Sequence, residues 1–273
     1  MMRSLLALAA GFLAATPLLA ADQPRTEVKI TWHGQSWFEI TSSKGTNIVI
    51  DPHAIIEYGP IKGVYAHAIL NSHFHNDHTQ NQVIENFKEK VGKWPKAKVI
   101  EGLRREGVSE AWNQIDEKVR DVRIRSVGTY HDNVQGMSKG KNTVFIIEVD
   151  GIRVVHLGDL GHKLTKGQIK AIGPVDVLLI PVGGVYTING SEAKEVVEQL
   201  KPKKYIIPMH CATRVYEDLL SVKEFLEDQK KENIARSADN MLAVKVDFKP
   251  PEPIIVVLNW EPAPKRRPRA DKD

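Results

Sequence analysis

The chain has 273 residues, enough for one large domain or two small ones, and 42% are hydrophobic and 26% charged, as in ordinary globular proteins. Five basic and two acidic residues among the last twelve give three of the four net positive charges, and Arg3 gives the fourth. The rest is formally neutral, which argues against a basic nucleic-acid groove over the whole domain. The single cysteine, Cys211, excludes an intramolecular disulfide.

The N-terminus is typical of a secretory signal peptide. After Arg3, the run from Ser4 to Leu19 is almost wholly apolar and two alanines precede the first polar residues, so we predict a signal peptide at residues 1–21. An uncleaved membrane anchor is the alternative, because the run is close to the shortest length that spans a bilayer. Cleavage would leave a domain at residues 22–261 and a basic, disordered tail at residues 262–273, in a periplasmic or secreted protein without stable membrane association.

Short strands dominate the first half of the chain. Apolar and β-branched runs bounded by turn-forming residues predict strands at residues 28–31, 37–41, 47–51, 68–70, 98–100 and 122–127. Apolar residues at helical spacing predict a helix at residues 82–90. The charged segment at residues 101–121, which contains Trp112, is interpreted as a loop with a short helix.

The second half mixes hairpins with helices. The turn Asp150-Gly151 joins predicted strands at residues 143–149 and 152–156. Further strands are predicted at residues 177–181, 205–208, 241–246 and 254–258, and helices at residues 164–172, from an N-cap at Ser191 to Leu200, and at residues 219–230. Hairpins and helices in one unbroken stretch predict two sheets with helices outside them.

The most informative stretch lies at residues 71–78, where three histidines and an aspartate fall within six positions. Neutral imidazole and carboxylate groups are preferred ligands of Zn²⁺ and similar cations. In an extended segment His73 and His75 point to one face, and Asp77 and His78, at the turn beyond, can aim at an adjacent point. This arrangement suits a site for two metal ions better than a site for one.

Further potential ligands follow predicted strands later in the chain. They are His131, Asp159 and His210. Strand ends that open into loops are frequent places for functional sites. Each of the three alone would be an ordinary core, loop or turn residue, so the case depends on their occurring together with the first cluster.

In this order the residues resemble the metallo-β-lactamase superfamily, over roughly residues 28–258. The similarity is closest to the branch of ascorbate-phosphate lactonase-like hydrolases. The matching motifs are His73-Phe-His75-Asn-Asp77-His78, Trp32-His33-Gly34-Gln35-Ser36, Ile50-Asp51-Pro52, His156-Leu157-Gly158-Asp159 and Pro208-Met209-His210. The resemblance implies an α/β (α+β) fold, a four-layer αββα sandwich with the metals at one edge of the paired sheets.

The resemblance also implies two metal sites that share a bridge. The first site would consist of His73, His75 and His131, the second of Asp77, His78 and His210, and the bridge would be Asp159. Two cations about 3.5–4 Å apart share a hydroxide, lower its pKa and polarise the substrate oxygen. Asp77 and Asp159 would thereby take part in catalysis, Asp77 also as a proton acceptor. The two divalent ions are expected to be Zn²⁺. Because no ligand is a thiolate, the set does not demand zinc, and Mn²⁺ or Fe²⁺ are permitted.

Four other positions carry expectations of their own. Asp51 is interpreted either as a residue that orients a ligand or as a plain turn residue before proline. His162 is expected to contact the substrate, and the loop after Gly183-Gly184 borders the pocket in relatives. His156 falls within a strand and is expected to belong to the core.

The resemblance implies a metal-dependent hydrolase whose bridging hydroxide attacks an ester-type bond in a lactone, a phosphodiester or a similar compound. The predicted signal peptide implies that this hydrolase is exported. A β-lactamase is one alternative, although members with that activity generally lack a bridging aspartate where Asp159 stands. A non-catalytic, metal-loaded protein that binds a metabolite is the other. The expected partner is a small-molecule substrate; no nucleic acid is expected, and a homo-oligomer is left open.

Overall fold

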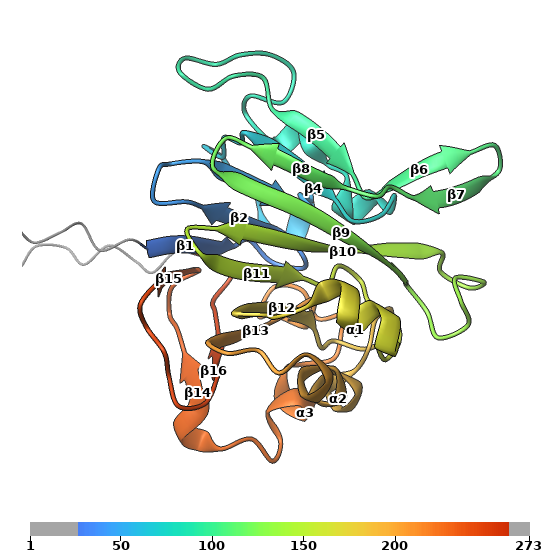
Figure 1. The fold of residues 1–273 in the computed structure, drawn as a ribbon, viewed down its shortest axis with the longest axis vertical. Helices are drawn as coiled ribbons and strands as arrows, with labels where there is room; N and C mark the ends of the chain where they lie inside the picture. The colour runs from blue at the N-terminus through green and yellow to red at the C-terminus, as the bar shows by residue number, and fades with distance from the viewer. Residues whose placement is uncertain (1–26, 262–273) are drawn as a thin grey trace, which may run out of the picture.

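Two large β-sheets form the frame of the molecule (Figure 1). The computed structural model describes residues 27–261, so the predicted signal peptide at residues 1–21 and the predicted tail at residues 262–273 lie outside the described residues. Within the described part, no helix is both long and apolar enough to cross a membrane.

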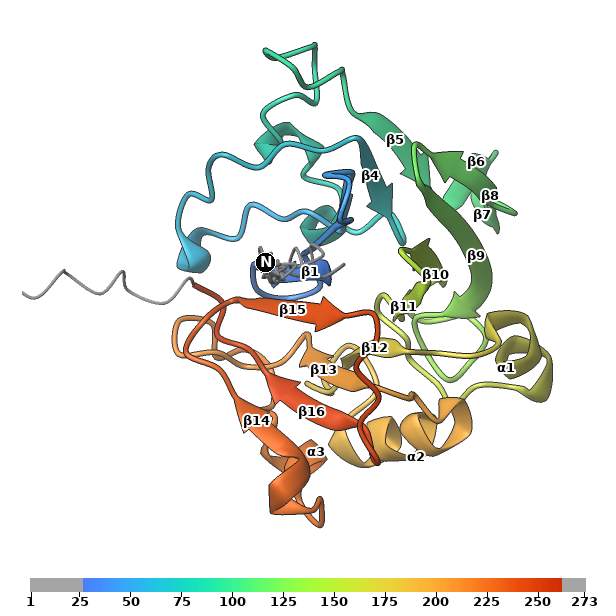
Figure 2. The same ribbon diagram turned by 60° about the vertical axis from the view of Figure 1, so that its left-hand side comes forward.

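The first sheet has six strands in the order β15-β1-β2-β3-β4-β5. They are β1 (Glu27–Trp32), β2 (Phe38–Thr41), β3 (Asn47–Ile50), β4 (Ala68–Asn71), β5 (Lys98–Glu101) and β15 (Met241–Lys245). β1, β2 and β3 form an antiparallel meander, whereas β3, β4 and β5 run parallel. Figure 2 shows β15 beside β1, and their antiparallel pairing brings a late strand of the chain into the sheet of the first strands.

The second sheet has eight strands in the order β14-β16-β13-β12-β11-β10-β9-β8. They are β8 (Asp116–Val119), β9 (Val122–Tyr130), β10 (Lys141–Val149), β11 (Ile152–His156), β12 (Val177–Pro181), β13 (Tyr205–Met209), β14 (Ile234–Arg236) and β16 (Ile254–Val257). β8 to β11 are antiparallel neighbours, and β11, β12, β13, β16 and β14 run parallel.

The remaining elements are short. A separate hairpin of β6 (Leu103–Glu106) and β7 (Ser109–Trp112) extends away from the two sheets (Figure 1). The α-helices are α1 (Lys166–Ile172), α2 (Gly190–Leu200) and α3 (Lys223–Leu226), and the 3-10 turns are η1 (Ile56–Tyr58), η2 (Asn76–His78), η3 (Asn81–Val83) and η4 (Lys231–Asn233).

The core fills the space between the sheets and the outer face of the second sheet. Alternate residues of both sheets, such as Ile30, Phe38, Phe145 and Leu179, are fully buried in one cluster. A second cluster joins the opposite face of the second sheet to the three α-helices. The outer face of the first sheet is covered by loops and 3-10 turns, which bury Trp37 and neighbouring apolar side chains. The predicted mixed α/β fold with paired sheets is thus confirmed, with few helices.

Most predicted strands are confirmed, and so is the hairpin at Asp150-Gly151. These two residues have φ values of 49° and 77°, the positive values that a two-residue turn of type I′ requires. His156 is fully buried in β11, as expected for a core residue.

The predicted N-cap at Ser191 is wrong. The N-cap of α2 is Asn189, whose side chain accepts a hydrogen bond from the backbone of Glu192 at 2.9 Å, and the Glu192 carboxylate accepts one from the backbone of Asn189 at 3.0 Å. This reciprocal pair is a capping box, and it satisfies two N–H groups that a cap at Ser191 would leave without partners.

The predicted helix at residues 82–90 is also wrong, because the segment contains only a 3-10 turn. Asn86 is fully buried, and its side chain bonds the backbone N–H of Ala66 at 2.9 Å and its carbonyl at 2.7 Å. These bonds hold the segment as a loop across the first sheet. Ile84 still packs in the apolar cluster there, which explains the helical spacing of apolar residues.

Two further segments differ from their predictions. Residues 101–121 form β6, β7 and β8 rather than a loop with a short helix. Trp112 stabilises that arrangement, since its indole N–H donates to the carbonyls of Thr129 at 3.1 Å and Asn142 at 2.9 Å. Of the helix predicted at residues 219–230, only the four residues of α3 are helical.

Candidate metal centre

The candidate ligands all follow strands or occupy the 3-10 turn next to them. His73 and His75 follow β4, and η2 supplies Asp77 and His78. The other three follow strands of the second sheet. His131 comes directly after β9 and His210 directly after β13, and Asp159 comes three residues after the end of β11. The structure therefore brings both sheets into one site.

One carboxylate oxygen lies at the centre of this site. Asp159 Oδ2 is 3.3 Å from His78 Nε2, 3.2 Å from His131 Nε2 and 3.1 Å from His210 Nε2. The side chains of all four residues are almost completely buried. Three imidazoles that face one buried carboxylate oxygen are the arrangement expected around metal ions.

The remaining predicted ligands complete two groups around this centre. The ring centroids of His73, His75 and His131 lie 4.6–4.9 Å from one another. Asp77 Oδ2 lies 3.6 Å from His78 Nε2. Ligand atoms within 4.8 Å of one another define three overlapping groups: His73, His75 and His131; Asp77, His78 and His210; and His73, His78 and Asp159. The structure thus brings all seven predicted ligand residues together.

The donor set fits divalent cations. Buried ring nitrogens without a hydrogen-bond partner are costly, and the site contains such atoms in His73 Nε2 and His78 Nε2. The other nitrogen of each ring faces an oxygen: His73 Nδ1 lies 2.9 Å from the Ser72 hydroxyl, and His78 Nδ1, which also lacks a hydrogen bond, lies 3.0 Å from Asp51 Oδ2. An oxygen beside the outer ring nitrogen is usual for a histidine that binds a metal.

The charge states of His73 and Asp159 agree with this interpretation. Burial and the neighbouring His78 hold the pKa of His73 well below 6.5, so His73 is a neutral ligand at pH 7. Burial alone would raise the pKa of Asp159, but the imidazoles of His210 and His78 outweigh it and hold that pKa well below 3.8. Asp159 is therefore an anion, as a bridging ligand must be.

Asp51 supports the first cluster from behind. Its buried carboxylate accepts hydrogen bonds from the backbone N–H and the hydroxyl of Ser72, both at 2.7 Å, in addition to its contact with His78 Nδ1. Burial disfavours protonated His78, but the carboxylates of Asp159 and Asp51 raise the pKa of His78 well above 6.5. Of the two interpretations of Asp51, the geometry favours the one in which it orients a ligand.

The first motif holds the Asp159 carboxylate. The Ser36 hydroxyl donates to Asp159 Oδ1 at 3.1 Å, and the backbone N–H of Asp159 donates to the Asn142 side chain at 2.9 Å. Gln35, which has a positive φ of 46°, accepts a hydrogen bond from the backbone of His210. Ser36 therefore holds the central carboxylate itself, and Asn142 holds the backbone from which it projects.

A cleft of about 520 Å³ opens over the centre. Its lining combines ligand residues with one lysine and two tyrosines: His75, Asp77, His131, Lys139, Asp159, Tyr186, His210 and Tyr216. Tyr186 belongs to the loop that was expected to border the pocket. The sequence did not predict that Lys139 and Tyr216 line the cleft, because neither belongs to a recognisable motif. For Lys139, the signal was its place in the glycine-containing loop that follows His131.

The structure does not bring His162 to this cleft. Its Nε2 accepts a hydrogen bond from the backbone of Tyr130 at 3.1 Å, and its Nδ1 lies 2.8 Å from the carbonyl of Lys163. Both ring nitrogens serve the local backbone, so nothing in this geometry supports the predicted contact with a substrate.

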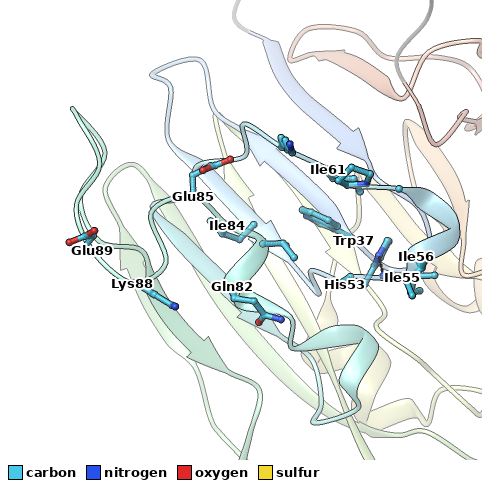
Figure 3. A pocket seen from close by; sticks show the side chains of 15 residues that line it. Trp37, His53, Ile55, Ile56, Ile61, Gln82, Ile84, Glu85, Lys88 and Glu89 are labelled. Atoms are coloured by element: carbon cyan, nitrogen blue, oxygen red, sulfur yellow. Dashed lines mark hydrogen bonds between the residues drawn. The ribbon is translucent and has the colours of Figure 1, made fainter.

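A separate cavity of about 660 Å³ lies on the outer face of the first sheet (Figure 3). Trp37, Ile61 and Ile84 give it an apolar floor, and Glu85 and Lys88 stand at its edge. His53 lines it as well, and burial lowers the pKa of His53 to about 4, so this histidine is neutral. None of the candidate metal ligands lines this cavity, which therefore carries none of the metal chemistry.

The chain belongs to the metallo-β-lactamase superfamily. Residues 29–210 match the Beta-lactamase superfamily domain. A UPF0173 metal-dependent hydrolase of Thermococcus onnurineus is 30% identical over 206 residues, which cover 68% of this chain and 85% of the relative. A similar relative from Nitratidesulfovibrio vulgaris, also described as a metal-dependent hydrolase, is 31% identical over 203 residues, 68% of this chain and 81% of the relative.

Solved structures of similar proteins agree with this assignment to the superfamily. A candidate Zn-dependent hydrolase of the superfamily from Thermotoga maritima superposes with a TM-score of 0.62 and 38% identity, over 85% of this chain and 98% of the other. A structure from Parabacteroides distasonis shares the fold, with a TM-score of 0.52 and 23% identity, over 74% of this chain and 90% of the other. The protein is therefore a metal-dependent hydrolase of this superfamily. Its predicted kinship with the ascorbate-phosphate lactonase-like branch stays a prediction.

Proposed function

We propose that the protein is an exported, dinuclear metal-dependent hydrolase that cleaves an ester-type bond in a small molecule. The observation that carries the proposal is the position of the Asp159 carboxylate between two groups of potential ligands. A site for a single ion would not need six further donors around that carboxylate.

The two sites divide the donors as follows. The first ion would be held by His73, His75 and His131, the second by Asp77, His78 and His210, and Asp159 would touch both. Two divalent cations bound there would activate a water molecule and polarise the substrate oxygen. Nitrogen and oxygen donors without a thiolate accept Zn²⁺, which we propose as the native ion, and also Mn²⁺ or Fe²⁺.

The side chains themselves have three tasks. Asp159 sets the spacing of the two sites, because Ser36 holds one of its oxygens and three imidazoles face the other. Asp77 is the partly exposed carboxylate of the cleft, with 40% of its side chain accessible, so it can accept a proton as the bond is cleaved. Tyr186 and Tyr216 line the cleft beside the ligands, where their rings can pack against a bound substrate.

The proposed substrates are lactones, phosphodiesters and related esters. All of them place an electrophilic carbon or phosphorus next to an oxygen that cations can polarise. Nothing in the cleft of the described residues favours a β-lactam or a nucleic acid over a small ester. Export rests on the sequence of residues 1–21 alone, and cell fractionation with and without that segment would test it.

Elemental analysis of the purified protein, followed by a hydrolysis panel with the metal found, tests the proposal. We expect about two equivalents of a divalent metal per chain and turnover of at least one ester class. His75→Ala should abolish turnover and lower the metal content, because it removes a ligand from the first site. Full activity in rigorously metal-stripped protein would contradict the mechanism, and metal-replete protein that binds ligands but cleaves none would instead support the metabolite-binding alternative.

A further inference from the structure

The loop that follows His131 is held in shape by a single carboxylate. Asp132 is buried, and its two oxygens accept four backbone hydrogen bonds of 2.7–2.9 Å from Val134, Gly136, Ser138 and Lys139. A loop with four of its N–H groups fixed on one side chain has a defined conformation. The position of Lys139 relative to the metal centre is therefore built into the fold.

The side chain of Lys139 spans from this loop to the opposite wall of the cleft. Its ammonium donates to the carbonyls of Val185 at 2.9 Å and Tyr186 at 2.7 Å, and it lies 5.6 Å from the centroid of the Tyr186 ring. An ammonium has three N–H donors, so one remains for a ligand. Val185 adopts a φ of 54°, a strained value for a β-branched residue that is typical of functional loops.

Lys139 stands at the boundary of two cavities. One is the metal cleft, and the other is a chamber of about 390 Å³ between this loop and the β6–β7 hairpin, which we call the side chamber. His75 and Lys139 line both cavities. The side chamber therefore adjoins the metal cleft at these two residues.

The side chamber carries unpaired charge. Its charged lining residues are Lys139, Lys141 and Glu110, and within residues 27–261 none of them forms an ion pair. Lys141 lies 5.1 Å from the Trp112 ring centroid, and Arg105 lies 5.1 Å from the ring of Phe74, which also lines the chamber. Positive charge exceeds negative charge in a half-enclosed, polar space, which favours an anionic ligand.

We propose that the side chamber binds an anionic arm of the substrate, a carboxylate or a phosphate-type group, between Lys139 and Lys141 while the scissile ester lies over the metal centre. This inference rests on the proposed hydrolase activity and narrows its substrate class to esters with a second, anionic end. Charge-assisted hydrogen bonds of this kind orient a substrate strongly and discriminate against neutral analogues.

Lys141 is the better residue to change, because Lys139 also ties two loops together. The assay compares 4-nitrophenyl esters of one length that differ at the far end: the mono-ester of adipate, its ω-phosphonate counterpart and neutral 4-nitrophenyl hexanoate. Wild-type protein, Lys141→Gln, Glu110→Gln and the control Lys118→Gln are measured with metal present. Lys118 is an exposed lysine of β8 that lines neither cavity.

In the wild type we expect kcat/KM to be about ten-fold higher for the anionic esters than for hexanoate, as one hydrogen bond between charged groups would give. Lys141→Gln should remove most of this preference by raising KM, without a change in kcat or in the rate with hexanoate. Glu110→Gln should lower KM for the anionic esters, and Lys118→Gln should change nothing. Added salt should weaken the preference in the wild type. Comparison of kcat/KM between the carboxylate ester and the phosphonate ester shows which anion is preferred.

Two results would overturn the inference. One is turnover of all three esters at equal efficiency, and the other is a preference for anionic esters in Lys141→Gln that equals that of the wild type. Either result would refute the proposed role of the side chamber without contradicting the proposed hydrolase activity. If no ester is cleaved, the proposed function fails in this assay. Calorimetry with adipate and phenylphosphonate then tests whether the side chamber binds anions. Binding that is weakened by Lys141→Gln and not by Lys118→Gln would support it, and no binding, or equal binding by all variants, would refute it.

Discussion

Replacement of Asp51 by asparagine tests whether the carboxylate behind His78 tunes the metal affinity of the proposed second site. The asparagine side chain would keep the volume of the original one and tolerate the φ of 48° at this position. It can still accept one of the two hydrogen bonds from Ser72, but its amide N–H₂ would face either the Ser72 hydroxyl or His78 Nδ1. The fully buried site thereby loses a charge-assisted contact.

The expected loss of metal affinity follows from that contact. Loss of one hydrogen bond to a charged group is worth about 1.5–3 kcal/mol, which corresponds to an affinity loss of about 10–100-fold and agrees with the usual effect of partners behind a metal ligand. Competition titration of Zn²⁺ against a chromophoric chelator should therefore show one weakened site and one normal site. Asp176→Asn is the control, since Asp176 also accepts a backbone hydrogen bond but lies outside the cleft. Two sites of wild-type affinity in the Asp51→Asn variant would refute the reasoning.

Other predictions concern positions at increasing distance from the ligands. His162→Ala should change kcat/KM by less than about two-fold, because both ring nitrogens bond the local backbone, and a larger loss in steady-state assays would restore its predicted substrate contact. Gly183→Ala should destabilise the fold by about 2 kcal/mol or more in urea denaturation, since a Cβ there would overlap the His210 carbonyl. Gly167→Ala, in the first turn of α1, should instead stabilise it by about 0.5–1 kcal/mol, because the added Cβ would meet only the Thr165 hydroxyl at an ordinary contact distance of 3.9 Å. Equal effects of the two changes would contradict this account. Burial raises the pKa of the Cys211 thiol to about 12, so little reactive thiolate is present below that pH. Iodoacetamide at pH 8 should therefore label the unfolded protein but not the native protein. Rapid labelling of the native protein, detected by mass spectrometry, would be inconsistent with this burial.

The sequence predicts the strands, and that the candidate ligands lie together, for the same physical reason. Both depend on local patterns: alternation of apolar residues defines most strands, and His73, His75, Asp77 and His78 lie close together in the chain. His131, Asp159 and His210 could be added because each comes soon after a buried strand. The structure places all of these residues at one centre.

What escaped prediction depends on contacts between distant segments. The segment at residues 82–90 has helical spacing, but Asn86 bonds the backbone of Ala66 and keeps it a loop. Trp112 lies in a charged segment and forms strand structure because its indole N–H finds two carbonyls of the second sheet. Lys139 reaches the cleft only through the loop that Asp132 organises. Such tertiary hydrogen bonds override local propensity and leave no periodic signal.

The central claim is that two metal ions flank Asp159. Anomalous diffraction at the zinc edge, from crystals of the metal-replete protein, measures this directly. The account predicts two peaks about 3.5–4 Å apart, one among His73, His75 and His131 and the other among Asp77, His78 and His210. A single peak, or peaks that leave the Asp159 carboxylate without a metal neighbour, would contradict it.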